Sequence, residues 1–112
     1  MGDKDDRGDL LRGALEMLIL RTLRGEPMHG FGITETLREL SDDVLSVDEG
    51  SMYPALYRMQ QRGWIQAEWG RSDNNRRAKF YSLTAEGQRQ LDAASQRWDR
   101  FSEAVRRVME PA

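Results

Sequence analysis

The chain has 112 residues and a formal net charge of −2, and this length fits a single domain with a modest core. It contains no cysteine and one histidine, which excludes disulfides, thiolate metal ligands and a two-histidine zinc site.

The sequence predicts neither a membrane span nor an enzyme. Its apolar runs are far shorter than the ~20 residues that cross a bilayer, and the start MGDKDDRGD lacks the apolar stretch of a signal peptide. We therefore predict a cytoplasmic location. A Ser–His–Asp triad would depend on His29 alone, and no Gly-rich phosphate loop occurs, so no catalytic site, metal or cofactor is expected.

Basic residues are concentrated in one stretch. Residues 51–80 hold six Lys or Arg against two acids, while the rest of the chain is net acidic. A basic segment on an acidic body would turn one face toward a polyanion. The alternative is an ordinary solvated face.

The first elements are predicted from punctuation and apolar spacing. Residues 1–9 are charged and are expected to form a flexible leader. An amphipathic helix should then run from Leu10 to Gly25, followed by a second helix from the EPMHG segment to the polar SDD stretch. The apolar stripe of the second helix is predicted to contain Ile33, Leu37 and Leu40.

A third helix is expected in DEGSMYPALYRMQQRGW. Asp48 is placed to cap it and Gly63 to end it, with Pro54 tolerated in or near the first turn. Its buried stripe should be Met52, Leu56 and Met59.

The periodicity then changes to that of strands. WIQAEW and KFYSL alternate bulky with small or polar side chains and predict two antiparallel strands. The segment GRSDNNRRA between them is typical of an exposed hairpin tip.

A long helix is expected at the end of the chain, from about Ala85 to Met109 and capped by Thr84. Its apolar residues recur at the three- and four-residue spacing of a coiled-coil seam. They predict a dimer interface that contains Leu91, Trp98, Phe101, Val105 and Val108.

The element order is that of a winged helix-turn-helix. The expected fold is mainly α with a small two-stranded β-hairpin (α+β), with a DNA-binding domain at 10–84 and a dimerisation helix at 85–112. An α-helix fits the major groove, and a basic hairpin reaches phosphates or the minor groove. The expected partner is therefore double-stranded operator DNA.

The third helix and the hairpin both offer candidate DNA contacts. Arg58 could read a guanine or clamp a phosphate, and the hydroxyls of Ser51 and Tyr53 could bind phosphate, although Tyr53 could equally pack in the core. In the hairpin, donor-bearing side chains cluster at Asn74, Asn75, Arg76, Arg77 and Lys79.

The sequence resembles the PadR-like family of transcriptional regulators, in particular its short members with a single C-terminal helix. The resemblance spans Leu10 to about Val108 and is carried by LLRGALEMLIL, PMHGFGI, GSMYPAL, NNRRAKFYSLTAEG and WDRFSEAVRRVM. It implies a homodimeric DNA-binding regulator, usually a repressor. It also implies that Ser51, Tyr53, Arg58, Asn75, Arg76, Arg77 and Lys79 contact DNA and that Gly30 is structural.

Two alternatives remain at this point. Trp98 and Phe101 could bind a small aromatic effector, or they could form only the core of the dimer. The chain as a whole could also be a winged-helix protein-interaction module that does not bind DNA. Such a module does not need basic groups on both the third helix and the hairpin, and this chain has both.

Overall fold

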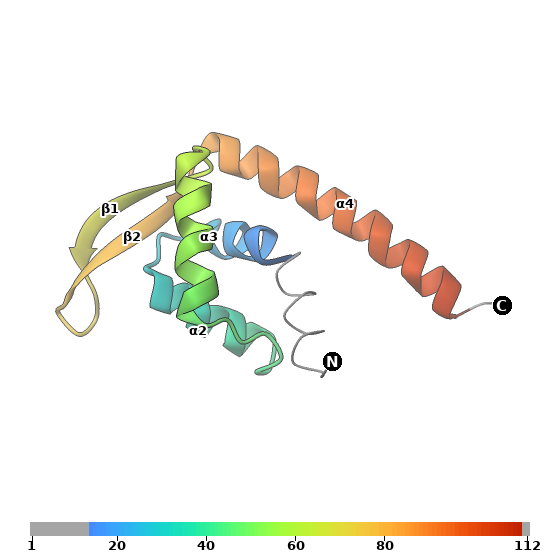
Figure 1. Cartoon of the computed structure of the whole chain (residues 1–112), viewed down its shortest axis with the longest axis horizontal. Coiled ribbons are helices and arrows are strands. Elements are labelled where there is room, and N and C mark those ends of the chain that lie inside the picture. Colours follow the sequence, from blue (N-terminus) through green and yellow to red (C-terminus); the bar gives the residue numbers. More distant parts are fainter. Residues whose placement is uncertain (1–13, 111–112) are drawn as a thin grey trace.

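A computed structural model of the chain describes residues 14–110 and confirms the mainly helical α+β fold. The predicted leader at 1–9, and Leu10 and Leu11 after it, lie outside the described residues. Among residues 14–110, no helix is both long and apolar enough to cross a membrane. After a helix at residues 14–23 come α2 (Gly30–Leu40), α3 (Glu49–Gln61), β1 (Ile65–Arg71), β2 (Arg77–Leu83) and α4 (Ala85–Met109) (Figure 1).

The predicted helix ends are confirmed. The carboxylate of Asp48 accepts a hydrogen bond from the Ser51 amide at 2.8 Å, which caps α3. Gly63 follows the end of α3 with φ +78°, a conformation that favours glycine. The hydroxyl oxygen of Thr84 accepts from the Gly87 amide at 3.0 Å and caps α4.

The start of α2 is attached to the hairpin by a contact that the sequence did not predict. Met28 and Tyr81 form an isolated antiparallel bridge with N···O distances of 3.0 and 2.8 Å. The next residue, His29, caps α2 by accepting the Gly32 amide hydrogen bond at Nδ1, 3.0 Å away. His29 therefore has a structural role at the start of this helix.

The core confirms most of the predicted apolar stripes. The third-helix stripe is buried, and Ile33 and Leu37 of α2 are buried with it. The expectation for Leu40 was wrong, because this side chain is 80% exposed. Residues 38–40 form the last turn of α2 and are all exposed, so the core no longer covers the helix there.

Pro54 also lies deeper in α3 than expected. Because α3 begins at Glu49, Pro54 belongs to its second turn, and its missing N–H leaves the carbonyl of Gly50 without its usual helix partner. Gly50 and Pro54 are both exposed, so water can reach this carbonyl.

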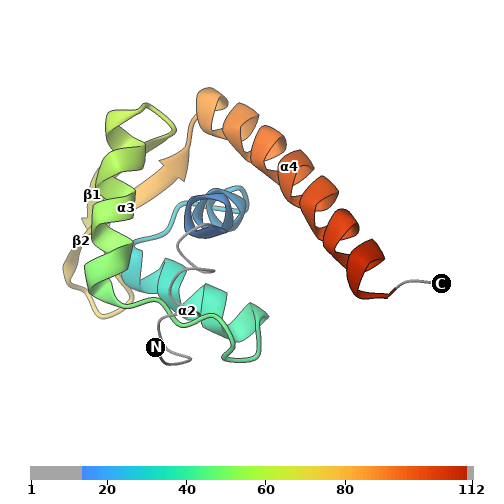
Figure 2. The ribbon, with the colours of Figure 1, turned by 45° about the vertical axis from the view of Figure 1, so that its right-hand side comes forward.

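Helix α4 leaves the body of the protein at an angle. In both ribbon views the helix of residues 14–23 lies between α3 and α4 (Figures 1 and 2). The first two turns of α4 pack on the body through Gly87 and Leu91, and residues from Ser95 onward are mostly exposed. The fold therefore presents α3 and the hairpin on one side and an uncovered helix on the other.

Candidate nucleic-acid interface

Helix α3 buries one face and exposes the opposite one. Met52, Ala55, Leu56 and Met59 are buried, whereas Tyr57 is 64% exposed and Ser51 and Gln61 are also exposed. With 3.6 residues per turn, Gly50, Tyr57 and Gln61 lie on the outermost line of the helix. Sequence reasoning did not select Tyr57 or Gln61, because exposure depends on how the helix packs.

Tyr53 lies on the flank of α3 that faces α2. A Cβ added at Gly30 would come within 2.7 Å of the Tyr53 ring and hydroxyl, so the glycine lets the ring lie against the start of α2. The side chain of Tyr53 is nevertheless partly exposed. The structural role expected for Gly30 therefore has a physical basis, and Tyr53 combines packing with access to solvent.

Arg58 is placed on the opposite flank, where it forms an ion pair. Its Nε lies 3.6 Å from Oε2 of Glu16, a residue of the first helix. Arg62, one turn later, donates from Nη1 to both oxygens of the same carboxylate at 3.3 Å. Arg58 was expected to be free to contact DNA. No spacing in the sequence indicates an ion pair with a residue 42 positions earlier.

The tip of the hairpin is shorter than predicted, because β1 and β2 extend to the pair Arg71 and Arg77. The turn is closed by hydrogen bonds of 2.8 Å from Ser72 N to Arg76 O and from Asn75 N to Ser72 O. Asn75 adopts φ 58°, a left-handed conformation that asparagine tolerates well. Asn74, Asn75 and Arg76 are therefore displayed at the exposed tip, and Arg76 forms no ion pair within residues 14–110.

An exposed tryptophan organises the two cations nearer the base of the hairpin. Trp69 lies directly across from Lys79 in the strand register. The guanidinium carbon of Arg77 is 4.3 Å from the centroid of the indole, and Lys79 Nζ is 6.0 Å from it. These are cation–π distances, so Trp69 holds both cations on one face of the hairpin. This role could have been inferred from the alternation of side chains along the strands.

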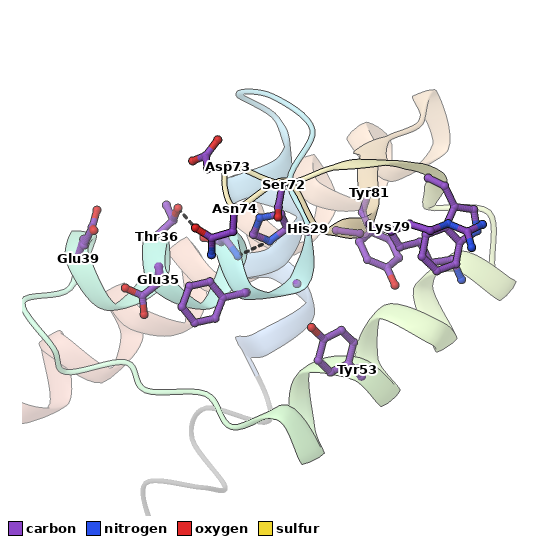
Figure 3. A pocket seen from close by; sticks show the side chains of 16 residues that line it. His29, Glu35, Thr36, Glu39, Tyr53, Ser72, Asp73, Asn74, Lys79 and Tyr81 are labelled. Carbon is purple, nitrogen blue, oxygen red and sulfur yellow. Dashed lines mark hydrogen bonds between the residues drawn. The ribbon is translucent and has the colours of Figure 1, made fainter.

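An open groove of about 840 Å³ separates the hairpin from α2 and α3 (Figure 3). At one end Tyr53, Tyr81 and Lys79 are close together in the view, and Glu35, Glu39 and Asp73 lie toward the other end. Burial, with a smaller contribution from Tyr53, raises the pKa of Tyr81 above its usual value. The groove therefore has a hydroxyl-bearing, basic end and an acidic end.

The residues predicted for dimerisation lie away from this groove, on α4, and two of them, Trp98 and Phe101, lie beside the first helix. Leu91 is only 4% exposed and belongs to the hydrophobic core of this chain, whereas the other residues of the predicted interface are exposed. Trp98 and Phe101 are 48% and 62% exposed, with ring centroids 6.2 Å apart, and Val105 and Val108 are also exposed. Trp98 and Phe101 line a second cavity, of about 210 Å³, together with Ala14, Met17, Ala94 and Arg97.

Within residues 14–110 the structure contains no group of three acidic or histidine side chains that could hold a metal ion. The groove itself offers hydroxyls and cations at one end and carboxylates at the other.

A family model and several solved structures similar to this chain name the same family. The sequence model described as "Transcriptional regulator PadR-like family" matches residues 19–93, more than half of the chain. A PadR-like transcriptional regulator from Bacillus cereus is 30% identical, with a TM-score of 0.80 over 93% of this chain and 99% of that one. A PadR family regulator from Eggerthella lenta is 29% identical, with a TM-score of 0.77 over 93% of this chain and 88% of that one. A transcriptional regulator from Clostridium thermocellum shares the fold, with a TM-score of 0.83 over 91% of this chain and 99% of that one at 22% identity.

Proposed function

Since this chain belongs to the PadR-like family of transcriptional regulators, we propose that it binds double-stranded operator DNA through α3 and the hairpin. The family consists of transcriptional regulators and not of enzymes. The observation that carries the proposal is the hairpin tip, where Asn74, Asn75 and Arg76 are exposed next to Arg77 and Lys79. A hairpin needs no such density of donors to fold.

In this proposal α3 enters the major groove and the hairpin follows the adjacent backbone. The exposed face of α3 supplies Ser51, Tyr57 and Gln61, whose hydroxyl and amide groups can bind phosphates or base edges. The hairpin supplies positive charge that neutralises phosphates whatever the sequence. Binding energy would come mainly from the hairpin and discrimination mainly from α3.

The groove between these two elements offers a path for the phosphate backbone. Tyr53 and Lys79 line its basic end, and both carry donors suited to phosphate oxygens. Glu35 and Glu39 line the other end and would repel a phosphate. We therefore place the backbone at the end of the groove formed by Tyr53 and Lys79.

The proposed regulator is a homodimer joined through α4. Trp98, Phe101, Val105 and Val108 are exposed along this helix, and large exposed aromatics of this kind are usually covered in an assembly. A dimer would carry two copies of α3 and would fit a pseudo-palindromic operator with half-sites about one helical turn, ~34 Å, apart or a multiple of it. We propose that it acts as a repressor, as members of the family that the sequence resembles usually do.

An effector that relieves repression is proposed at Trp98 and Phe101. The cavity they line in one subunit measures about 210 Å³, which is below the ~300 Å³ at which ligand pockets begin. A flat aromatic ligand would therefore need surface from the second subunit as well. The alternative is that the two rings form only the dimer core.

The proposal is tested by titrating the protein with fragments of its native genome at several salt concentrations. We expect sequence-dependent binding that weakens steeply with salt. Replacing Arg76 and Arg77 with alanine should reduce the salt slope by about 2 and weaken binding to every sequence alike. The matched control replaces two exposed arginines outside α3 and the hairpin, Arg24 and Arg89, and should change the slope much less.

Two outcomes would reject the proposal. One is undetectable affinity at low salt, and the other is equal affinity for all fragments. Undetectable affinity, together with capture of a stable protein partner, would favour the alternative of a winged-helix protein-interaction module, which would present its basic hairpin to an acidic partner.

A further inference from the structure

Glu16 on the first helix forms ion pairs with Arg58 of α3 and with Arg62, the residue that caps the end of α3. Its carboxylate lies 3.6 Å from Nε of Arg58 and 3.3 Å from Nη1 of Arg62. Arg58 and Arg62, the C-cap residue of α3, are four residues apart and so lie on the flank of the helix that faces the first helix. A single acid therefore pairs with both cations that α3 and its C-cap could offer to DNA.

These ion pairs are exposed enough to exchange with another anion. The side chains of Arg58 and Arg62 are about half exposed, and that of Glu16 is 30% exposed. Exposed pairs of this kind contribute little to the stability of a fold and are screened by salt. Glu16 is therefore better placed to compete for the arginines than to hold the protein together.

We propose that Glu16 is a specificity-determining residue that withholds Arg58 and Arg62 from phosphates outside the operator. The inference rests on the proposed DNA-binding function. A non-specific duplex offers an arginine only a generic phosphate, which must displace the carboxylate. An operator also contributes base contacts along α3, and this extra binding energy offsets the loss of the pairs.

The competition has a measurable signature. In Glu16→Gln the arginines lose their anionic partner, so affinity for a random-sequence duplex should rise about two- to tenfold at low salt. Each arginine that gains a phosphate adds about 0.9 to the salt slope, so the slope should steepen by about 1 to 2. Affinity for the operator should rise less, and discrimination between the two DNAs should fall.

The experiment compares the binding of the wild-type protein and of its Glu16→Gln variant to three polyanions. These are the genomic fragment that the wild-type protein selects, a random-sequence duplex of equal length, and heparin. Binding to heparin is measured as the salt concentration at which the protein elutes from a heparin column. Glu26→Gln is the control, because Glu26 is exposed and forms no ion pair with another described residue. Each acid is also replaced in a background that carries Arg58→Ala and Arg62→Ala.

The inference is supported if Glu16→Gln alone tightens binding to random duplex and heparin, and if the gain disappears in the arginine-free background. It is overturned if Glu16→Gln behaves like Glu26→Gln, if the gain persists without the arginines, or if operator and random duplex gain equally. A wild-type protein that selects a fragment but does not respond to Glu16→Gln would sink only this inference. A wild-type protein without sequence preference, combined with an arginine-dependent gain on heparin, would instead reject the proposed function and support the competition.

Discussion

The guanidinium of Arg77 lies over the indole of Trp69, with Cζ 4.3 Å from the ring centroid. Lys79, directly across the hairpin from Trp69, approaches the same ring at 6.0 Å. The indole of Trp69 on β1 thus holds two positively charged side chains of β2 near one another. In the proposed complex this arrangement presents both cations to the phosphate backbone before DNA arrives, which reduces the entropy lost on binding.

Replacing Trp69 with alanine should weaken DNA binding although Trp69 itself carries no charge. Exposed cation–π contacts contribute roughly 0.5–1 kcal/mol, so the expected loss is about two- to fivefold, and Trp69→Phe should lose less. A double-mutant cycle on DNA affinity gives the measurement. Trp69→Ala should couple with Arg77→Ala and be additive with Arg76→Ala, whose side chain lies at the tip; equal coupling to both would contradict the role of the indole.

Tyr81 should make the stability of the fold depend on pH, and the direction of its pKa shift gives the sign of this dependence. Burial raises the pKa of Tyr81, and the neighbouring Tyr53 adds to the effect. The folded protein thus favours the neutral phenol of Tyr81. The resulting contribution to the free energy of unfolding is fully present below the unfolded pKa of about 10 and is lost as the pH rises through the folded pKa. The chain has three tyrosines, so the step that belongs to Tyr81 is assigned by comparing the tyrosinate absorbance of the wild-type protein with that of Tyr81→Phe.

We expect Tyr53→Phe to lower the pKa of Tyr81 only partly, because burial is the larger cause. Tyr81→Phe should remove part of the alkaline loss of stability, measured by chemical denaturation at neutral and alkaline pH. An unshifted Tyr81 in the wild-type protein would contradict the packing seen in the groove.

Local features of the fold were predictable from the sequence. Asp48 and Thr84 cap their helices through hydrogen bonds to residues three positions away, and Gly63 ends α3 through its own backbone conformation. Such signals involve only a few consecutive residues, so the sequence contains all the information they need. The hairpin and the long last helix were predictable for the same reason, since their periodicities are local.

Contacts between distant residues were not predictable in this way. The bridge between Met28 and Tyr81 and the ion pair between Glu16 and Arg58 both depend on how elements pack, and no spacing in the sequence reports them. Leu91 is a further example. Its spacing from Trp98 continues the coiled-coil pattern, but its side chain packs in the hydrophobic core of the same chain. Periodicity identifies the face of a helix but not what covers it.

Gly87 should be far less tolerant of substitution than its helical position suggests. In an ordinary helix, Gly→Ala stabilises by about 1 kcal/mol. Here an added Cβ would lie 2.0 Å from the carbonyl oxygen of Trp64 and 2.8 Å from Cδ1 of Leu83, so α4 would have to move off the hairpin. We expect Gly87→Ala to lower the free energy of unfolding by about 2–4 kcal/mol, measured by urea denaturation.

Gly63→Ala is the matched control for this prediction. A Cβ at Gly63 meets no atom within 4 Å, but its φ of +78° costs a non-glycine residue roughly 1–2 kcal/mol. Gly87→Ala should therefore be the more destabilising of the two. A neutral or stabilising Gly87→Ala would show that α4 does not pack against Trp64 as the structure has it.

Leu91 and the pair Trp98 and Phe101 lie on the same helix but should respond differently to truncation. Leu91→Ala removes a side chain buried in its own subunit, so it should lower the free energy of unfolding by about 2–5 kcal/mol. Trp98→Ala with Phe101→Ala removes exposed rings, so it should leave the subunit fold intact and weaken association.

Sedimentation over a range of protein concentrations, combined with far-ultraviolet circular dichroism, separates the two effects. The double variant should sediment as a monomer at concentrations where the wild-type protein is a dimer, while it retains its helical signal. Because dimerisation stabilises by mass action, the wild-type unfolding midpoint should rise with protein concentration and that of the double variant should not. A double variant that associates as tightly as the wild-type protein would show that Trp98 and Phe101 are not part of the dimer interface.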